Sequence, residues 1–200
     1  MKCFIDFDRT LLDSSRLRQD ICLAFPGSSE EELEAHHKIF REQEPFTVIG
    51  FGNYLTKRGI DGEELCRLFY EHAKKANQYL FDDAKTFLEQ LREAGHEPIL
   101  LTRTMESDVE HWQKPKVDSS GLLPLLHDAH ITTTTKQDVI REQNVSEPFV
   151  FIDDKQSEID AMHEAFPNAL CLKHEPGAPL LPHLTKINGF IQSHVDLFQN

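Results

Sequence analysis

Short apolar segments alternate with segments of helical periodicity along most of the chain. Apolar segments lie at 98–101, 148–152 and 169–172, and another at 2–8 ends in two aspartates. Such short segments, apolar on both faces, are typical of buried strands in a parallel sheet. The sequence therefore predicts strands at these four places. The threonine run at 132–135 suits an extended segment, but we assign no strand to it.

Between these strands, apolar residues recur at the spacing of amphipathic helices. The clearest stripe runs from Ala84 to Leu91 at positions i, i+3, i+4 and i+7, and Gly95 is expected to end this helix. Further helices are predicted over 137–143, 159–166 and 184–198. Strands that alternate with helices predict an α/β fold, a Rossmann-like doubly wound parallel sheet with helices on both faces.

The stretch 14–79 has helical patterning and no convincing strand. Leu65, Leu68 and Phe69 belong to its clearest apolar stripe, and 28–32 reads as a helix start with a capping box. We predict that 14–79 is a helical domain inserted after the first strand. The core domain would then comprise 1–13 and 80–200.

Composition and charge exclude several classes of protein. With 200 residues, 39% of them apolar, the chain can bury one sizeable core, which excludes a disordered or collagen-like chain. Twenty-one basic residues against 34 acidic ones give a net charge of −13, so a nucleic-acid partner is not expected.

The cysteines and the apolar segments bear on the compartment. The four cysteines are far apart and form no C-x-x-C pair, which favours reduced thiols in a cytoplasmic protein over disulfides or structural zinc. No apolar stretch reaches membrane-spanning length, and the first residues do not form a signal peptide. We expect a monomer or homodimer with no membrane partner.

Two carboxylates follow the first predicted strand. In an extended chain Asp6 and Asp8 point the same way, because successive side chains alternate between faces. Two carboxylates at such a short distance repel each other unless a cation lies between them or one of them is protonated. Mg²⁺, which prefers hard oxygen ligands, would fit this pair. For an isolated D-x-D, a solvated pair at a strand end would be the better interpretation.

The other polar residues at predicted strand ends complete a set. Thr102 offers a hydroxyl, and Lys136 lies ahead of a predicted helix and could neutralise a phosphate. Asp153 and Asp154 follow a third strand, and Glu158 lies one helical turn later. Each residue alone has an ordinary structural explanation, such as a turn, a solvated lysine or a helix cap. Together they supply a nucleophile, a proton carrier, a phosphate contact and a metal site.

This order and spacing resemble the haloacid dehalogenase-like hydrolase superfamily, in its phosphatase type with a helical cap. The first motif of that family, D-x-D-x-[TV]-[LV] after an apolar strand, matches residues 4–11, and its second, a strand ending in Thr or Ser, matches 99–102. Its fourth, a strand ending in D-D, matches 151–154, with Glu158 as the later acid. For its third motif, a lysine ahead of a helix, we assign Lys136, with Lys114 or Lys116 as alternatives.

The resemblance implies roles for these residues. Asp6 would attack phosphorus to form an aspartyl-phosphate, and Asp8 would be the general acid and base. Thr102, Arg103 and Lys136 would contact the phosphate of a small phosphorylated substrate. Mg²⁺ would be held by Asp6, the backbone carbonyl of Asp8 and Asp154, with Asp153 or Glu158 reaching it through water. The segment 14–79 would be the cap.

Two positions depart from the family pattern. Arg9 stands where phosphatases of this family commonly carry glycine, and Arg103 follows the motif threonine. Arg9 could alter the hinge to the cap or reach the site, and Arg103 could contact phosphate or form a surface salt bridge. These departures leave the substrate open.

Other functions use a similar set of residues. A phosphomutase or another phosphotransferase would share the nucleophile and the metal, as would a phosphonatase. A dehalogenase needs neither the second aspartate nor a metal, and a receiver domain places its acid pair and its phosphorylated aspartate on separate strands. An inert interaction module on the same fold is the non-enzymatic alternative.

Overall fold

The computed structural model describes residues 1–145 and 148–198, with side chains through 192. The chain divides into two compact units, one formed by 1–13, 80–103 and 122–200 and the other by 14–79 and 104–121. We call them the sheet unit and the helical unit and describe each by itself. Among the described residues, no helix is both long and apolar enough to cross a membrane.

The sheet unit contains a parallel sheet whose described strands run in the order β3-β2-β1-β4-β5. The first strand, β1, lies at the centre, between β2 and β4. The strand order therefore reverses direction at β1, and in open α/β sheets ligands bind beside the carboxyl ends of the strands at such a point. The bounds are β1 Lys2–Ile5, β2 Glu97–Arg103, β3 Asp128–Thr132, β4 Val150–Asp153 and β5 Leu170–Lys173.

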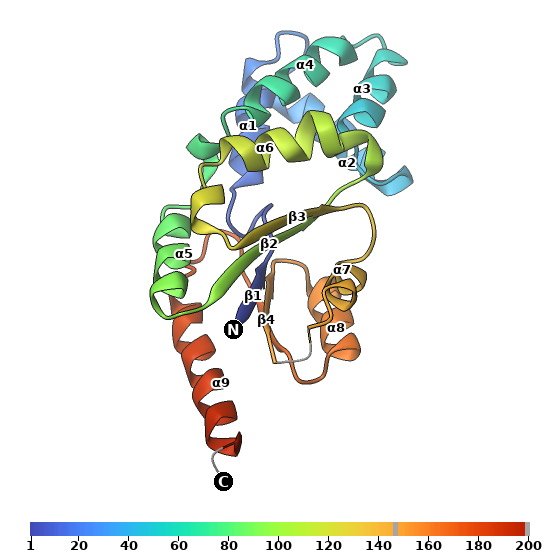
Figure 1. Cartoon of the computed structure of the whole chain (residues 1–200). Helices are drawn as coiled ribbons and strands as arrows, with labels where there is room; N and C mark the ends of the chain where they lie inside the picture. Colours follow the sequence, from blue (N-terminus) through green and yellow to red (C-terminus); the bar gives the residue numbers. More distant parts are fainter. Residues whose placement is uncertain (146–147, 199–200) are drawn as a thin grey trace. The chain divides into compact units, whose positions relative to one another are not determined.

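Helices flank both faces of this sheet, as the sequence predicts (Figure 1). Phe4 pairs in register with Ile99 on one side and Phe151 on the other, so all three side chains lie on one face. They form a buried core with Ile140 and Met162 from the helices α7 and α8. Figure 1 shows α5 and α9 on the other side of the sheet. The bounds are α5 Ala84–Glu93, α7 Lys136–Glu142, α8 Gln156–Ala165 and α9 Pro182–Phe198, with a 3₁₀ turn, η4, at Leu123–Leu125.

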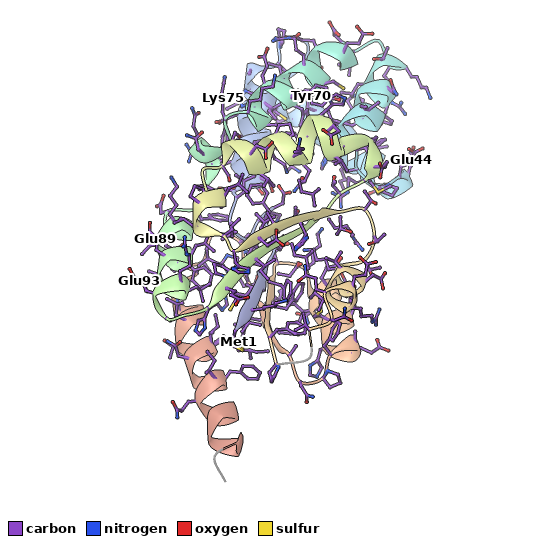
Figure 2. All side chains as sticks on the ribbon, in the orientation of Figure 1. Met1, Glu44, Tyr70, Lys75, Glu89 and Glu93 are labelled. Carbon is purple, nitrogen blue, oxygen red and sulfur yellow. The ribbon has the colours of Figure 1, made fainter. Side chains whose placement is uncertain are left out.

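Helix α5 shows how the apolar spacing determines packing. Phe87 and Leu91 are fully buried, whereas Glu89 and Glu93 are exposed and point away from the sheet (Figure 2). The helix ends at Glu93, and Gly95 follows it with a φ of 79°, a conformation that glycine adopts without strain.

Strand β3 is the element that the sequence pattern missed. It lies at the edge of the sheet and pairs only with β2 among the described strands. Of its residues only Thr132 is buried, so it lacks the apolar run that marks a central strand. The strand ends where the threonine run begins, and Thr135 instead caps the next helix by accepting a hydrogen bond from the backbone N–H of Asp138.

The helical unit contains helices and no strand in its two segments, both of which the structure describes in full. The capping box predicted at 28–32 is present: the Ser29 hydroxyl accepts from the Glu32 N–H, and the Glu32 carboxylate accepts from the Ser29 N–H. The bounds are α1 Ser14–Ala24, α2 Glu30–Gln43, α3 Val48–Thr56, α4 Gly62–Ala73, η1 Ala76–Tyr79, η2 Glu106–Asp108, η3 Val109–Gln113 and α6 Lys114–Ser119, where η1 and η2 are 3₁₀ turns and η3 is a π-helix.

The segment 104–121 corrects the predicted domain boundary. The sequence placed it in the core with 80–200, but it groups with the helices of 14–79. Trp112 packs edge-on against Phe69, and the buried Asp108 accepts hydrogen bonds from the Val48 N–H at 3.0 and 3.1 Å. These contacts bury aromatic and acidic side chains that the segment 104–121 could not bury alone.

Candidate active site

Asp6 lies at the carboxyl end of the central strand, where the strand order reverses. Its backbone N–H donates to the carbonyl of Ile152 at 2.9 Å, which ties it to the end of β4. The chain then turns, because the Phe7 carbonyl accepts hydrogen bonds from Leu11 and Leu12 at 2.9 Å each. The predicted strand 2–8 therefore ends at Ile5, and the turn directs the Asp6 side chain, only 6% exposed, toward β4.

Lys136 joins two of the predicted acids. Its ammonium donates to the Asp6 carboxylate at 2.5 Å and to the Asp153 carboxylate at 2.6 Å. Lys136 is the first residue of α7 and is buried, as are both of its partners. Residues 130 positions apart in the sequence thus meet in one buried ion cluster.

Three carboxylates gather at this end of the sheet. Asp6, Asp153 and Asp154 are all buried, and each presents an oxygen within 4.8 Å of the others. The second oxygen of Asp153 accepts from the Lys155 N–H at 2.8 Å, which fixes the carboxylate. Asp154 pairs with the Arg9 guanidinium, Nε to Oδ2, at 3.2 Å.

Burial and mutual repulsion shift the acidity of these groups. Burial raises the pKa of Asp6 to about 6, against the attraction of Lys136 and with added repulsion from Asp153. Burial, and then the negative charge of Asp6, raise the pKa of Asp154. Burial alone would lower the pKa of Lys136, but the two carboxylates that it contacts outweigh burial and raise it. The lysine therefore remains charged, and the cluster holds more negative than positive charge at neutral pH.

The donor set fits a hard divalent cation. Buried carboxylates that are close together are stable only when paired with positive charge, and Lys136 contacts two of the three. The third, Asp154, has one oxygen, Oδ1, that is buried and has no hydrogen-bond partner. Carboxylate oxygens are the ligands that Mg²⁺ prefers, and one or two of them normally suffice. Glu158 and the Asp8 side chain lie outside this group of carboxylates.

Thr102 and Asp8 lie at the same end of the sheet. Thr102 is on β2 one residue before its end, only 1% exposed. Asp8 is half-buried, two residues beyond Asp6, in the turn that leads away from β1. Parallel strands align their carboxyl ends, so both residues lie at the edge that carries Asp6 and Asp153.

Arg103 forms an ion pair rather than standing free. Its guanidinium lies 2.9 Å from the Glu158 carboxylate, whose side chain is 8% exposed. Of the two roles considered for Arg103, a phosphate contact or a salt bridge, the structure contains the salt bridge. Lys114 and Lys116, the alternatives to Lys136, belong to the helical unit. Lys136 belongs to the sheet unit, and its contacts with Asp6 and Asp153 are the ones that the structure shows.

Two features of the site were not predicted from the sequence: the backbone N–H of Lys155 and the backbone conformation of Arg9. The Lys155 N–H orients Asp153 in an Asx turn, a local conformation that aspartate favours. The second is the conformation of Arg9. Its φ of 66° is left-handed, which costs a non-glycine residue about 1 kcal/mol, and the glycine that the resembled motif commonly carries here could have indicated it.

Solved structures share this fold. A haloacid dehalogenase-like hydrolase from Burkholderia xenovorans LB400 is 19% identical, with a TM-score of 0.71 over 88% of this chain and 82% of that one. A dehalogenase with an intermediate complex is 15% identical, with a TM-score of 0.65 over 89% and 86%. A protein called a predicted phosphoglycolate phosphatase, from Haemophilus somnus 129PT, is 16% identical, with a TM-score of 0.56 over 88% and 85%.

These likenesses show that the chain has the fold of the haloacid dehalogenase-like hydrolases, as its motifs predict. At such identities they establish the fold alone. No protein-family model matches the sequence, and no curated protein matches it.

Proposed function

We propose that this chain, on the fold of the haloacid dehalogenase-like hydrolases, is a magnesium-dependent phosphomonoester hydrolase. It would act on a small phosphorylated metabolite through an aspartyl-phosphate on Asp6. The observation that carries the proposal is the ion cluster at the reversal of strand order, in which Lys136 contacts both Asp6 and Asp153 beside a third carboxylate.

Asp6 is the proposed nucleophile. Its carboxylate oxygen would attack phosphorus while the bond from phosphorus to the ester oxygen breaks, leaving the phosphoryl group on Asp6. Asp8 would donate a proton to the departing oxygen and then take one from the water that attacks the aspartyl-phosphate. This second attack would release inorganic phosphate and restore both carboxyl groups.

Positive charge is needed because the site is acidic. Lys136 and the Thr102 hydroxyl would bind the phosphoryl oxygens, and the lysine is already held at Asp6. Asp6, Asp154 and the backbone carbonyl of Asp8 would hold Mg²⁺, with Asp153 in support through water. When bound, the cation would neutralise the charge that develops on the phosphoryl oxygens in the transition state.

Mg²⁺ binding should weaken in acid. With the pKa of Asp6 raised to about 6, this carboxyl is ionised at pH 7.5 but mostly protonated at pH 5 in the metal-free protein. A cation must then displace the proton, so the apparent affinity should fall by up to about tenfold per pH unit below 6. Calorimetric titration with Mg²⁺ at pH 7.5 and 5.0 measures this. Equal affinity at the two pH values would contradict the assignment of Asp6 as a ligand.

A substrate screen tests the proposed reaction. Purified protein is incubated with phosphorylated sugars, nucleotides, amino acids and small acids, with Mg²⁺ or with EDTA, and inorganic phosphate is measured. The proposal expects phosphate release that requires Mg²⁺. Transfer of phosphate to a second metabolite without release would favour the phosphotransferase alternative. Absence of any turnover, with Mg²⁺ present, would favour an inert interaction module.

The donor set separates this reaction from metal-free dehalogenation. That reaction needs neither a second aspartate near the nucleophile nor a buried carboxylate trio, whereas this chain carries both Asp8 and the trio. We also predict that the insertion 14–79 is a cap that selects the leaving group of the substrate.

A further inference from the structure

Arg9 is an arginine in a backbone conformation that glycine adopts more readily. Its φ of 66° is left-handed, and its N–H donates to the Leu12 carbonyl at 2.7 Å within the turn after β1. Glycine here would avoid the strain, yet the chain carries a long cationic side chain. The turn thereby directs a guanidinium toward the carboxylate cluster.

The contact that this guanidinium makes is to Asp154. Nε lies 3.2 Å from Oδ2, and the Asp154 side chain is 3% exposed whereas that of Arg9 is 53% exposed. The Asp154 carboxylate is therefore buried in the protein, whereas about half of the Arg9 side chain is in contact with solvent. An arginine so exposed can leave by rotating its side chain, without any change in the buried cluster.

Asp154 has one oxygen paired with a cation and one oxygen without a partner. Its Oδ1 is buried without a partner, and its Oδ2 is paired with Arg9. A divalent cation held by this carboxylate would lie within a few ångströms of the guanidinium, where like charges repel strongly. The arginine and a metal bound to Asp154 would therefore compete for the same carboxylate.

We propose that Arg9 is a built-in counter-ion for Asp154 that competes with the metal and sets the metal concentration at which the site fills. It pairs with Asp154 while no metal is bound and moves into solvent when the metal binds. This inference rests on the proposed function, because it takes Asp154 as a metal ligand. It adds a regulatory residue that glycine at this position would lack.

The test is Mg²⁺ affinity measured by calorimetry, with no substrate present. Arg9→Gln keeps an unbranched polar side chain and the same backbone strain but removes the competing charge. It should bind Mg²⁺ about fivefold more tightly than the wild type, the effect expected of one half-exposed ion pair. Arg9→Gly, which also relieves the strain, should bind at least as tightly.

The control is Arg141→Gln, which removes the same charge from an exposed arginine paired with Asp138 at 2.9 Å. Its Mg²⁺ affinity should change by less than about twofold, because surface charges outside the cluster are screened. A second readout is thermal unfolding: Arg9→Gln should unfold at a lower temperature than the wild type in EDTA, and the difference should disappear in saturating Mg²⁺.

The outcomes separate this inference from the proposed function. Equal or weaker Mg²⁺ binding by Arg9→Gln would overturn the inference alone, since the arginine would then be a support of the site and not a competitor. Failure of the wild type and both Arg9 variants to bind Mg²⁺ would overturn the proposed function and the inference with it.

Discussion

Replacing Asp6 with asparagine is expected to abolish phosphate release while the protein stays folded. The amide is nearly the same shape as the carboxylate but is not nucleophilic, so turnover should fall by at least about a thousandfold. The fold should survive because Lys136 keeps its contact with Asp153 at 2.6 Å. Phosphate release under saturating Mg²⁺, with circular dichroism and thermal unfolding, measures both parts of the expectation.

Asp160→Asn is the matched control. Asp160 is an exposed residue of α8 that accepts a hydrogen bond from the Gln156 side chain, and its substitution should leave turnover unchanged. An Asp6→Asn protein that is folded and releases phosphate at the wild-type rate would refute the nucleophile assignment.

Replacing Lys136 with methionine is expected to destabilise the protein and to abolish turnover together. The ammonium is buried and contacts two buried carboxylates, so its removal leaves their charge uncompensated. Losing one partner of such a cluster destabilises a protein by about 3 kcal/mol. Urea unfolding of the metal-free protein at pH 7.5 measures this loss, and phosphate release measures the activity. Lys85→Met, at an exposed position on α5, should change neither.

The pH dependence distinguishes lost charge from lost packing. Lys136 lowers the pKa of Asp6, so the variant should have an Asp6 pKa well above that of the wild type. Asp6 then binds a proton more readily in the folded variant than in the unfolded chain, so its contribution to the free energy of unfolding rises as the pH falls from 7.5 to 5. The difference in free energy of unfolding between the wild type and the variant should therefore become smaller as the pH falls. A gap that is constant with pH would mean that Lys136 acts through packing alone.

Much of the candidate site could be predicted because its residues follow central strands. Asp6, Thr102 and Asp153 each come at the end of a fully apolar segment, and such segments are buried parallel strands with aligned carboxyl ends. Once the sheet is parallel, these side chains lie along one edge, whatever their separation in the sequence. The α/β fold and its helices on both faces followed from the same pattern.

Lys136 was harder to predict because the strand before it is at the edge of the sheet. Strand β3 is mostly half-exposed and carries His130 and Asp128, so no apolar run marks it. Unless β3 is recognised as a strand, the sequence does not show that the chain reaches the carboxyl ends of the strands just before Lys136. Lys114 and Lys116 then fit the motif as well as Lys136 does. Edge strands share fewer neighbours and therefore impose a weaker sequence pattern than central strands.

Long-range packing explains the parts that the sequence left undetermined. The segment 104–121 contains no periodic signal for its partner, and contacts such as those of Trp112 with Phe69 and of Asp108 with Val48 show where it belongs. The Arg9 ion pair depends on a left-handed φ that arginine rarely adopts, so local preference argued against it. Both are decided by contacts between residues far apart in the chain.

The most direct test of the account is chemical trapping of the phosphorylated residue. Protein quenched during turnover of p-nitrophenyl phosphate with Mg²⁺ is reduced with borohydride, which converts an aspartyl-phosphate to homoserine, and the peptides are mapped by mass spectrometry. We expect homoserine at position 6 in the wild type and none in Asp6→Asn. Homoserine at another aspartate, or an unmodified Asp6 in protein that is turning over substrate, would contradict it.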